Sequence, residues 1–303
     1  MFKKVIVGID GRQGGQDALA LARQLLDAEG ELALIHIYLA EPVAWRGANA
    51  AYDLVLREEA DKLLAHAQEE SGVPARLVCH GAPSVGRGLH EAADKLGADL
   101  LVIGSSSRGH VGRVLSGDHT RRSLDGSPCA VAIAPSGYGH RKGSFDRIGV
   151  GYDETPESEH ALGVARQLAT AAHAQLATCH VVFLPARIYA GWPDQESIDG
   201  LVRDASRRLA QIEDAEPHAV FGTPAQELAQ FSASLDLLVI GSRSYGPVGR
   251  LLYGSTARDL TRLAHCPLLV LTRGARRRHT AERDAHAAQA VAVAVAVGAE
   301  PRV

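Results

Sequence analysis

The sequence predicts an α/β protein made of two tandem, doubly wound parallel five-stranded sheets of the Rossmann-like kind, and three observations lead there. The chain repeats itself once, because Asp99–Gly104, which reads Asp-Leu-Leu-Val-Ile-Gly, recurs unchanged as Asp236–Gly241. Short apolar runs alternate with helical patterns in both copies. These runs are continuously apolar, which is typical of parallel strands that helices cover on both faces.

Four further landmarks support the repeat and keep their order. Val7–Asp10 returns as Val150–Asp153, Leu34–Ile37 as Thr178–Val181, Gly81–Pro83 as Gly222–Pro224, and Pro128 as Pro267. Equivalent residues stay 137 to 144 positions apart. A copy of this length can bury a core of its own. We therefore expect one domain over residues 1–138 and a second over residues 146–273, joined by a stretch rich in glycine, serine and charge.

Each copy contains five predicted strands, joined by right-handed crossovers. In the first copy they fall at Lys4–Ile9, Leu32–Tyr38, Arg76–Cys79, Leu100–Ile103 and Ala130–Ala134. The helices between them are predicted at Gln16–Ala28, Leu54–Ser71, Ser84–Leu96 and His119–Leu124. In the second copy the strands fall at Arg147–Gly151, Gln175–Phe183, His218–Val220, Leu237–Ile240 and Leu268–Leu271.

Composition narrows the classes of partner. The net charge is −3 and aromatic residues make up 5%, so neither nucleic acid nor an anionic membrane is an expected partner. No apolar run reaches the roughly 18 residues of a membrane helix, and Asp10 interrupts the N-terminal run too early for a signal peptide. The four cysteines form no Cys-x-x-Cys pair. We expect reduced thiols and a cytoplasmic protein.

The chain changes character after the second copy. Arg276–His279 is a basic cluster, and residues 285–303 are nearly all alanine and valine with a few polar residues. We predict that the tail, residues 274–303, is disordered or loosely docked. The basic cluster is interpreted as a solvated charge run, with contact to an anionic partner as the alternative.

The chemistry is expected at the carboxyl ends of the strands, where open α/β sheets bind ligands. In the second copy the glycine-rich stretch Gly241–Thr256 follows a strand and leads into a helix that starts near Ser255. Glycines let backbone amides approach a ligand, and a helix N-terminus offers unpaired N–H groups to a phosphate. Ser255 either caps this helix or donates its hydroxyl to a phosphate oxygen. The stretch matches neither common phosphate-loop fingerprint, and the alternative is a simple turn.

The spacing of this loop resembles the ATP-binding signature of the universal stress protein family: Gly, two residues, Gly, nine residues, then Gly-Ser or Gly-Thr. The second copy fits with Gly241, Ser244 and Gly254-Ser255, and Ser244 stands where the family usually has glycine. The resemblance covers roughly residues 1–272. It implies a parallel sheet of strand order 3-2-1-4-5 in each copy. It further implies a cytoplasmic stress-response role, ATP with or without magnesium as the cofactor, and dimer formation, often through the last strand.

The resemblance also assigns roles to residues. In the second copy Asp153 would meet the adenine or ribose, and Val181 would offer backbone contacts to adenine. Ribose and phosphates would be held by Gly241, Ser244, Gly246, Gly249, Gly254, Ser255 and Thr256. The counterparts in the first copy are Asp10, Ile37, Gly104, Ser107 and Gly117.

The first copy departs from the signature at one place, because Asp118 follows Gly117 where the family has Ser or Thr. Two unit charges about 4 Å apart repel by roughly 4 kcal/mol at an effective dielectric constant of about 20. Magnesium, Arg113 and His119 would offset part of this cost. Asp118 is also a good helix cap, and both interpretations leave a poorer phosphate site. We predict that the second copy binds ATP more tightly than the first.

Some of these residues have purely structural interpretations. Asp10 and Asp153 either bind the ligand or cap the helix that follows. His36 and His180 are interpreted as structural histidines, because no other metal-ligating residue stands at a suitable spacing. No catalytic residue is predicted, since the sequence offers no convincing Ser/His/Asp arrangement.

Three functions remain. A nucleotide-binding regulatory protein is favoured, in which ATP shifts a population of conformations that a partner recognises. The alternative is a nucleotide-independent dimeric scaffold, which the altered signature of the first copy favours. A slow ATPase ranks last, because the sequence shows no P-loop lysine and no acidic pair to hold a metal. Self-association is expected through pairing of the two domains, within one chain or between chains.

Overall fold

A computed structural model of the chain describes residues 1–40, 49–72, 74–105, 125–141, 143–184, 194–242 and 254–271. Its first half contains β1 (Phe2–Gly8), α1 (Gln13–Leu25), β2 (Leu26–Leu39), α2 (Asn49–Ser71), β3 (Arg76–Ala82), α3 (Val85–Leu96), β4 (Leu100–Gly104) and β5 (Ala130–Ala134). A short 3₁₀ turn, η1 (Tyr138–His140), follows. The second half contains β6 (Arg147–Gly151), α5 (Pro156–Ala172), β7 (Gln175–Val182), α6 (Gln195–Leu209), β8 (Glu216–Phe221), α7 (Pro224–Ser232), β9 (Leu237–Gly241), α8 (Ser255–Leu263) and β10 (Leu268–Leu271).

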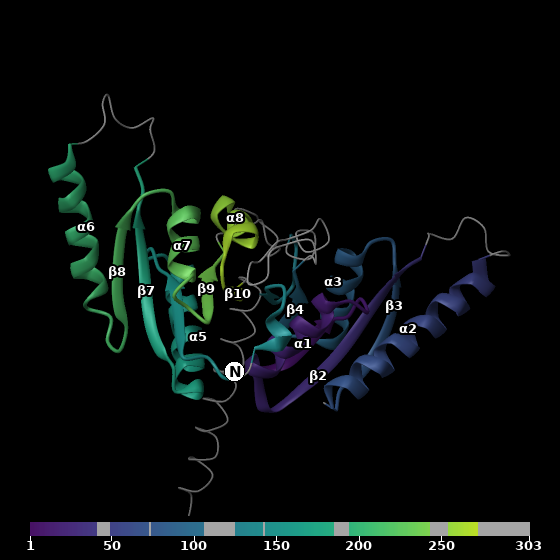
Figure 1. The fold of residues 1–303 in the computed structure, drawn as a ribbon. Helices are drawn as coiled ribbons and strands as arrows, with labels where there is room; N and C mark the ends of the chain where they lie inside the picture. The colour runs from purple at the N-terminus through teal and green to yellow at the C-terminus, as the bar shows by residue number, and fades with distance from the viewer. Residues whose placement is uncertain are drawn as a thin grey trace, which may run out of the picture.

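The ten strands form one sheet in the order β3-β2-β1-β4-β5-β10-β9-β6-β7-β8 (Figure 1). Within each half every pairing is parallel, with the order 3-2-1-4-5. The predicted fold class is therefore confirmed. The two halves meet where β5 and β10 pair antiparallel, with Val131 opposite Val270 and Ile133 opposite Leu268. All residues of these two strands are buried, so the two five-stranded sheets continue into one another through a dry joint.

Helices cover both faces of the sheet, as the apolar strands require. On one face α1 and α5 pack on a core that includes Leu100, Val102 and Val239. On the other face α3, α7 and α8 pack on a core that includes Leu101 and Leu238. Each core contains residues from both halves, so burial is continuous across the β5–β10 joint.

The first predicted helix was placed too late in the chain. The prediction was Gln16–Ala28, whereas α1 ends at Leu25 and β2 begins at Leu26. Leu26 has extended dihedral angles (φ −69°, ψ 136°) and pairs with Phe2 at the start of β1. The pairing with β1 therefore extends β2 back to the end of the helix. The predicted helix His119–Leu124 and the tail, residues 274–303, lie outside the described residues.

The stretch that joins the halves is held by a buried carboxylate. Asp17 of α1, which is 1% exposed, accepts hydrogen bonds from Gly137 N at 2.9 Å and Gly139 N at 2.7 Å. Gln13 Nε2 donates to the same carboxylate at 3.2 Å. Between the two glycines, the buried Tyr138 donates its hydroxyl to Gln24 Oε1 at 3.0 Å. The joining stretch is therefore packed against α1.

The repeated aspartate of the Asp-Leu-Leu-Val-Ile-Gly landmark ties two strands together in each half. The carboxylate of Asp99 accepts the backbone N–H groups of Lys3 and Lys4 at 2.8 and 3.0 Å. In the second half, Asp236 accepts Asp146 N and Arg147 N at 2.8 and 2.9 Å. The aspartate of the landmark therefore has a structural role, because it links the strand that it precedes to the neighbouring strand.

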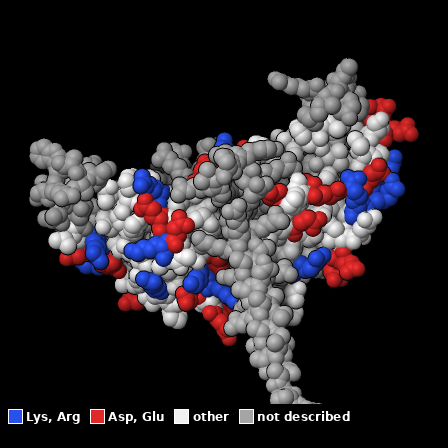
Figure 2. All heavy atoms as spheres, turned by 180° about the vertical axis from the view of Figure 1, so that it is seen from behind, with Lys and Arg blue, Asp and Glu red and all other residues white. Residues whose placement is uncertain are grey.

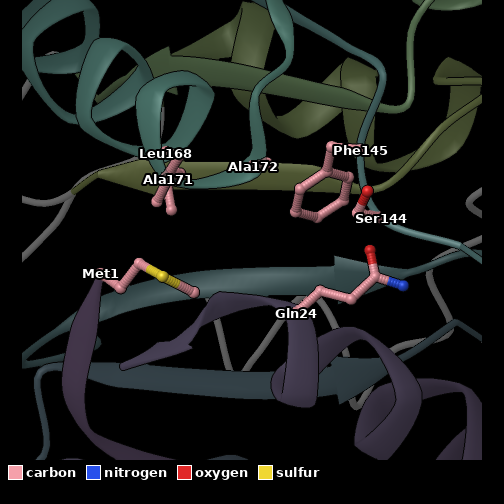
Figure 3. A pocket seen from close by; sticks show the side chains of 7 residues that line it. All are labelled: Met1, Gln24, Ser144, Phe145, Leu168, Ala171 and Ala172. Carbon is pink, nitrogen blue, oxygen red and sulfur yellow. The ribbon is translucent and has the colours of Figure 1, made fainter. Parts of the chain in front are cut away.

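A cavity of about 180 Å³ lies between the halves. Figure 3 shows Met1 and Gln24 on one side of it and the second half on the other, with Phe145, Leu168 and Ala172. Met1 and Phe145 precede β1 and β6, so the cavity lies at the amino edge of the sheet, opposite the predicted ligand site. On the face seen in Figure 2, basic and acidic side chains are interspersed. None of the described helices is long and apolar enough to cross a bilayer.

Candidate functional site

The predicted ligand residues that the structure describes lie at the carboxyl edge of the sheet or in the elements just beyond it. They are Asp10, Ile37, Gly104, Asp153, Val181, Gly241, Gly254, Ser255 and Thr256. Ser107, Gly117, Ser244, Gly246 and Gly249 lie outside the described residues. The described part of the candidate site therefore consists of strand ends and helix starts.

The N-terminus of α8 carries backbone donors that no described side chain caps. Its N-cap residue is Gly254, with φ −59° and ψ 150°, and no side-chain hydrogen bond closes this end. The proposal that Ser255 caps the helix is therefore wrong, since Ser255 is the first helical residue. The first-turn N–H groups have no partner within the helix, and its dipole favours an anion at this end. A Cβ placed on Gly254 would meet none of the described atoms within 4 Å.

The aspartates after β1 and β6 order the turns in which they lie. Asp10 Oδ1 accepts a hydrogen bond from Arg12 N at 3.1 Å, and Asp153 Oδ1 accepts from Thr155 N at 3.3 Å. The N-cap residues of α1 and α5 are Arg12 and Thr155. The interpretation of the aspartates as helix caps is therefore wrong. Their role toward a ligand stays a prediction.

The glycines that end β4 and β9 are explained by close packing of helix on strand. A Cβ on Gly104 would lie 2.0 Å from Gly14 O, and a Cβ on Gly241 would lie 2.4 Å from Glu157 O. The first turns of α1 and α5 therefore rest directly on these strand ends. This contact requires glycine whether or not a ligand binds.

The strands β2 and β7 extend past the ends of their central neighbours. β1 pairs with β2 up to Ile35, and the last bond is Ile9 N to Ile35 O at 2.8 Å. In the second half, Tyr152 N donates to Cys179 O at 2.9 Å, and β6 pairs with β7 no further than Cys179. Ile37 and Val181 stand two residues beyond these points, and both side chains pack on the core. Their backbone groups are what remains to contact a flat base, as the prediction requires.

The histidine of the second landmark is structural in the first half. His36 is half-buried, and its Nδ1 donates to Ile9 O at 2.8 Å, which fixes the turn that contains Asp10. The prediction that His36 is structural is therefore supported.

The two halves differ in charge where their first helices begin. The first turn of α1 contains no acidic residue, whereas that of α5 contains Glu157 and Glu159. Tyr152 donates its hydroxyl to Glu159. Burial and this hydrogen bond raise the pKa of Tyr152 to about 12.

Two residues at this edge of the sheet were not among the predicted site residues. Ser105 and Ser242 directly follow Gly104 and Gly241 and are 4% and 1% exposed. Within the part of the chain that the structure describes, neither hydroxyl has a hydrogen-bond partner. Their place after the same glycine in both copies was visible in the sequence. A serine after a glycine has no specific meaning by itself, however, and only burial without a partner distinguishes these two.

The described part of the chain offers no cluster of three His, Cys, Asp or Glu side chains that could hold a metal ion. All four cysteines are described, and none of them forms a disulfide bond. Burial raises the pKa of Cys179 to about 12, so this thiol stays protonated and behaves as a small core residue.

Comparison with known proteins identifies relatives of both halves. Residues 1–135 and 144–272 each match the model of the Universal stress protein family. A universal stress protein from Thermus aquaticus is 30% identical over 139 residues, which cover 44% of this chain and 98% of the relative. Universal stress protein Rv2005c from Mycobacterium tuberculosis is 28% identical over 186 residues, covering 57% of this chain and 61% of the relative. A crystal structure of a universal stress protein from Archaeoglobus fulgidus aligns with a TM-score of 0.63 and 19% identity, over 89% of this chain and 98% of that one.

Proposed function

Because this chain belongs to the universal stress protein family, a family of stress-response proteins, we propose that it binds ATP as a regulatory ligand, mainly in its second half. The site would be the carboxyl edge of the sheet, between the turn after β6 and the start of α8. The same proposal places the protein in the cytoplasm, with one domain over residues 1–138 and one over residues 146–273.

The observation that carries this proposal is the uncapped start of α8. The helix follows β9 along the chain and starts beyond the end of that strand, with Gly254 as its N-cap and Ser255 and Thr256 in its first turn. A triphosphate supplies the acceptors and the negative charge that such an end favours. Ser255 is exposed, and the first turn contains no acidic residue to repel a phosphate.

The remaining parts of an adenine nucleotide find complementary groups nearby. The backbone of β7 beyond Cys179 faces the space past the end of β6 and would contact the base. Asp153 lies in the turn after β6 and would meet the ribose. Magnesium, when bound with the nucleotide, would neutralise part of the phosphate charge.

Regulation is favoured over catalysis. Phosphoryl transfer needs groups that hold a metal and position a nucleophile, and the described residues offer no such cluster. The ligand would then act by ordering the loops at this edge, and a partner would recognise the ordered population. The antiparallel joint supports pairing of the two domains within one chain.

The test is calorimetric titration of the full chain with Mg-ATP. Ser255→Ala should weaken binding about tenfold, because one hydrogen bond to a charged acceptor is lost. Ser144→Ala is the control, since Ser144 is exposed at the opposite edge of the sheet. Absence of saturable binding, together with absence of co-purified adenine nucleotide by mass spectrometry, would favour the scaffold. Phosphate release that Ser255→Ala abolishes would favour the ATPase.

A further inference from the structure

Two buried serines behave unlike every other buried hydroxyl that the structure describes. The buried Ser and Thr residues are Ser105, Ser127, Ser158, Thr178, Ser232, Ser242 and Thr261. Five of these seven make hydrogen bonds; Ser127 Oγ donates to Cys129 O at 3.0 Å, for example, and Ser232 Oγ to Ala229 O at 2.6 Å. The hydroxyls of Ser105 and Ser242 have no hydrogen-bond partner among the described residues. A buried hydroxyl without a partner is costly, so its presence calls for a reason.

These two serines are equivalent residues of the two copies. Each directly follows the glycine that ends the repeated Asp-Leu-Leu-Val-Ile-Gly landmark. Each still takes part in the sheet, because Ser105 N donates to Ala134 O at 2.8 Å and Ser242 N to Leu271 O at 3.0 Å. A buried hydroxyl without a hydrogen-bond partner therefore occurs at the same position of the fold in both copies. A chance defect of packing does not explain this recurrence.

Strand geometry shows which face the hydroxyl of Ser242 occupies. Successive side chains of a strand point to opposite faces. The missing Cβ of Gly241 points at Glu157 of α5, so the side chain of Ser242 points to the other face. That face carries α8, whose residues Ala257 and Leu260 pack in the core there. The unpartnered hydroxyl and the uncapped start of α8 thus share one face and one edge of the sheet.

The first half repeats this arrangement. The missing Cβ of Gly104 points at Gly14 of α1, so Ser105 points to the face of α3. Residues 106–124, which follow Ser105, lie outside the described residues. The first half shows the equivalent hydroxyl, which is also buried and also has no partner among the described residues.

We propose that Ser105 and Ser242 are ligand-binding residues, one in each half, whose hydroxyls donate to an oxygen of the ribose-phosphate part of a bound nucleotide. The chain then has two nucleotide sites, and the first half keeps its site although Asp118 replaces the hydroxyl residue of the signature. This inference rests on the proposed function. It extends that function, because it assigns a donor, in both halves, to a position that the family signature leaves unspecified.

The test combines stability without ligand and affinity for ATP, measured on the full chain. A hydroxyl that forms a hydrogen bond only with a ligand does not stabilise the ligand-free protein. Ser105→Ala and Ser242→Ala should therefore leave the ligand-free Tm unchanged or raise it. Titration of the unmodified chain with Mg-ATP should show two sites. Each substitution should weaken one of them about tenfold and leave the other as it was.

Ser127→Ala and Ser232→Ala are the matched controls, because these serines are equally buried but already have partners. They should lower the ligand-free Tm and leave both affinities unchanged. If Ser105→Ala and Ser242→Ala lower the Tm in the same way, or bind ATP as the unmodified chain does, the inference is overturned while the proposed function stands. A single site that Ser105→Ala does not affect overturns the two-site arrangement. Absence of ATP binding by the unmodified chain overturns the proposed function, and the inference with it.

Discussion

Replacing Asp17 by asparagine tests how the two halves are held together. The Asp17 carboxylate uses both oxygens, one for Gly137 N and the other for Gly139 N and Gln13 Nε2. In Asp17→Asn one oxygen becomes an NH₂ group, which cannot accept a hydrogen bond. One backbone N–H then faces another donor in a place that water does not reach, because Asp17 is 1% exposed.

The expected cost follows from this count. A hydrogen bond to a charged group contributes about 1.5–3 kcal/mol, and a buried donor left unpaired costs about 1–3 kcal/mol. These two figures describe overlapping effects, so we expect a loss of about 2–4 kcal/mol in the free energy of unfolding. That is a large part of the roughly 5–15 kcal/mol by which a protein is stable.

Urea unfolding followed by circular dichroism measures this loss, and limited proteolysis shows whether the stretch around Gly137 becomes the first site of cleavage. Asp27→Asn is the matched control. Asp27 accepts one exposed backbone hydrogen bond, from Glu29 N at 3.2 Å, which the asparagine oxygen can keep, so its change should stay within about 0.5 kcal/mol. A loss equally small for Asp17→Asn would refute the idea that this carboxylate secures the junction.

Three further predictions concern the sheet and the same junction. Gly241→Ala should destabilise the protein, because its Cβ would lie 2.4 Å from Glu157 O. Gly163→Ala should stabilise it by about 0.5–1 kcal/mol, because a Cβ at this position of α5 meets no described atom within 4 Å and alanine favours a helix over glycine. A thermal unfolding experiment in which Gly241→Ala is the more stable variant would contradict the packing described. Burial raises the pKa of Tyr138 to about 12 from its ordinary value near 10, so its contribution to stability is complete below pH 10 and is lost as the pH rises from 10 to 12. Tyr138→Phe should cost about 1 kcal/mol at pH 7 and flatten this alkaline part of a Tm-against-pH profile; an unchanged profile would show that Tyr138 does not cause it. Val270→Asp would bury a lone carboxylate in the β5–β10 joint, where Val270 is 0% exposed, and should cost more than about 3 kcal/mol, so near-normal urea unfolding would show that the joint is not dry.

The repeat and the strands were predictable because they depend on local patterns. Ala130–Ala134, Arg147–Gly151 and Leu268–Leu271 are strands with the bounds that the apolar runs indicate. The start of β2 was not predictable, since Leu26–Glu31 lacks such a run and is extended through pairing with β1.

The contacts that secure the junction were beyond sequence reasoning for a different reason. Asp17 lies within a helix, where an aspartate usually faces solvent, and its partners lie 120 and 122 residues further along the chain. Gly104 and Gly241 were correctly singled out, but as places where a ligand approaches. The structure shows that another helix already makes a close approach there.

The antiparallel joint between β5 and β10 also bears on how the two copies have been free to diverge. If each copy were a separate polypeptide with an exposed edge strand of this kind, two identical copies would associate as readily as two different ones. Fusion in one chain fixes the ratio of the two different domains at one to one and keeps the edge strands β5 and β10 in the same molecule. A difference such as uncharged against acidic first turns at the two helices α1 and α5 is then inherited as a property of every molecule.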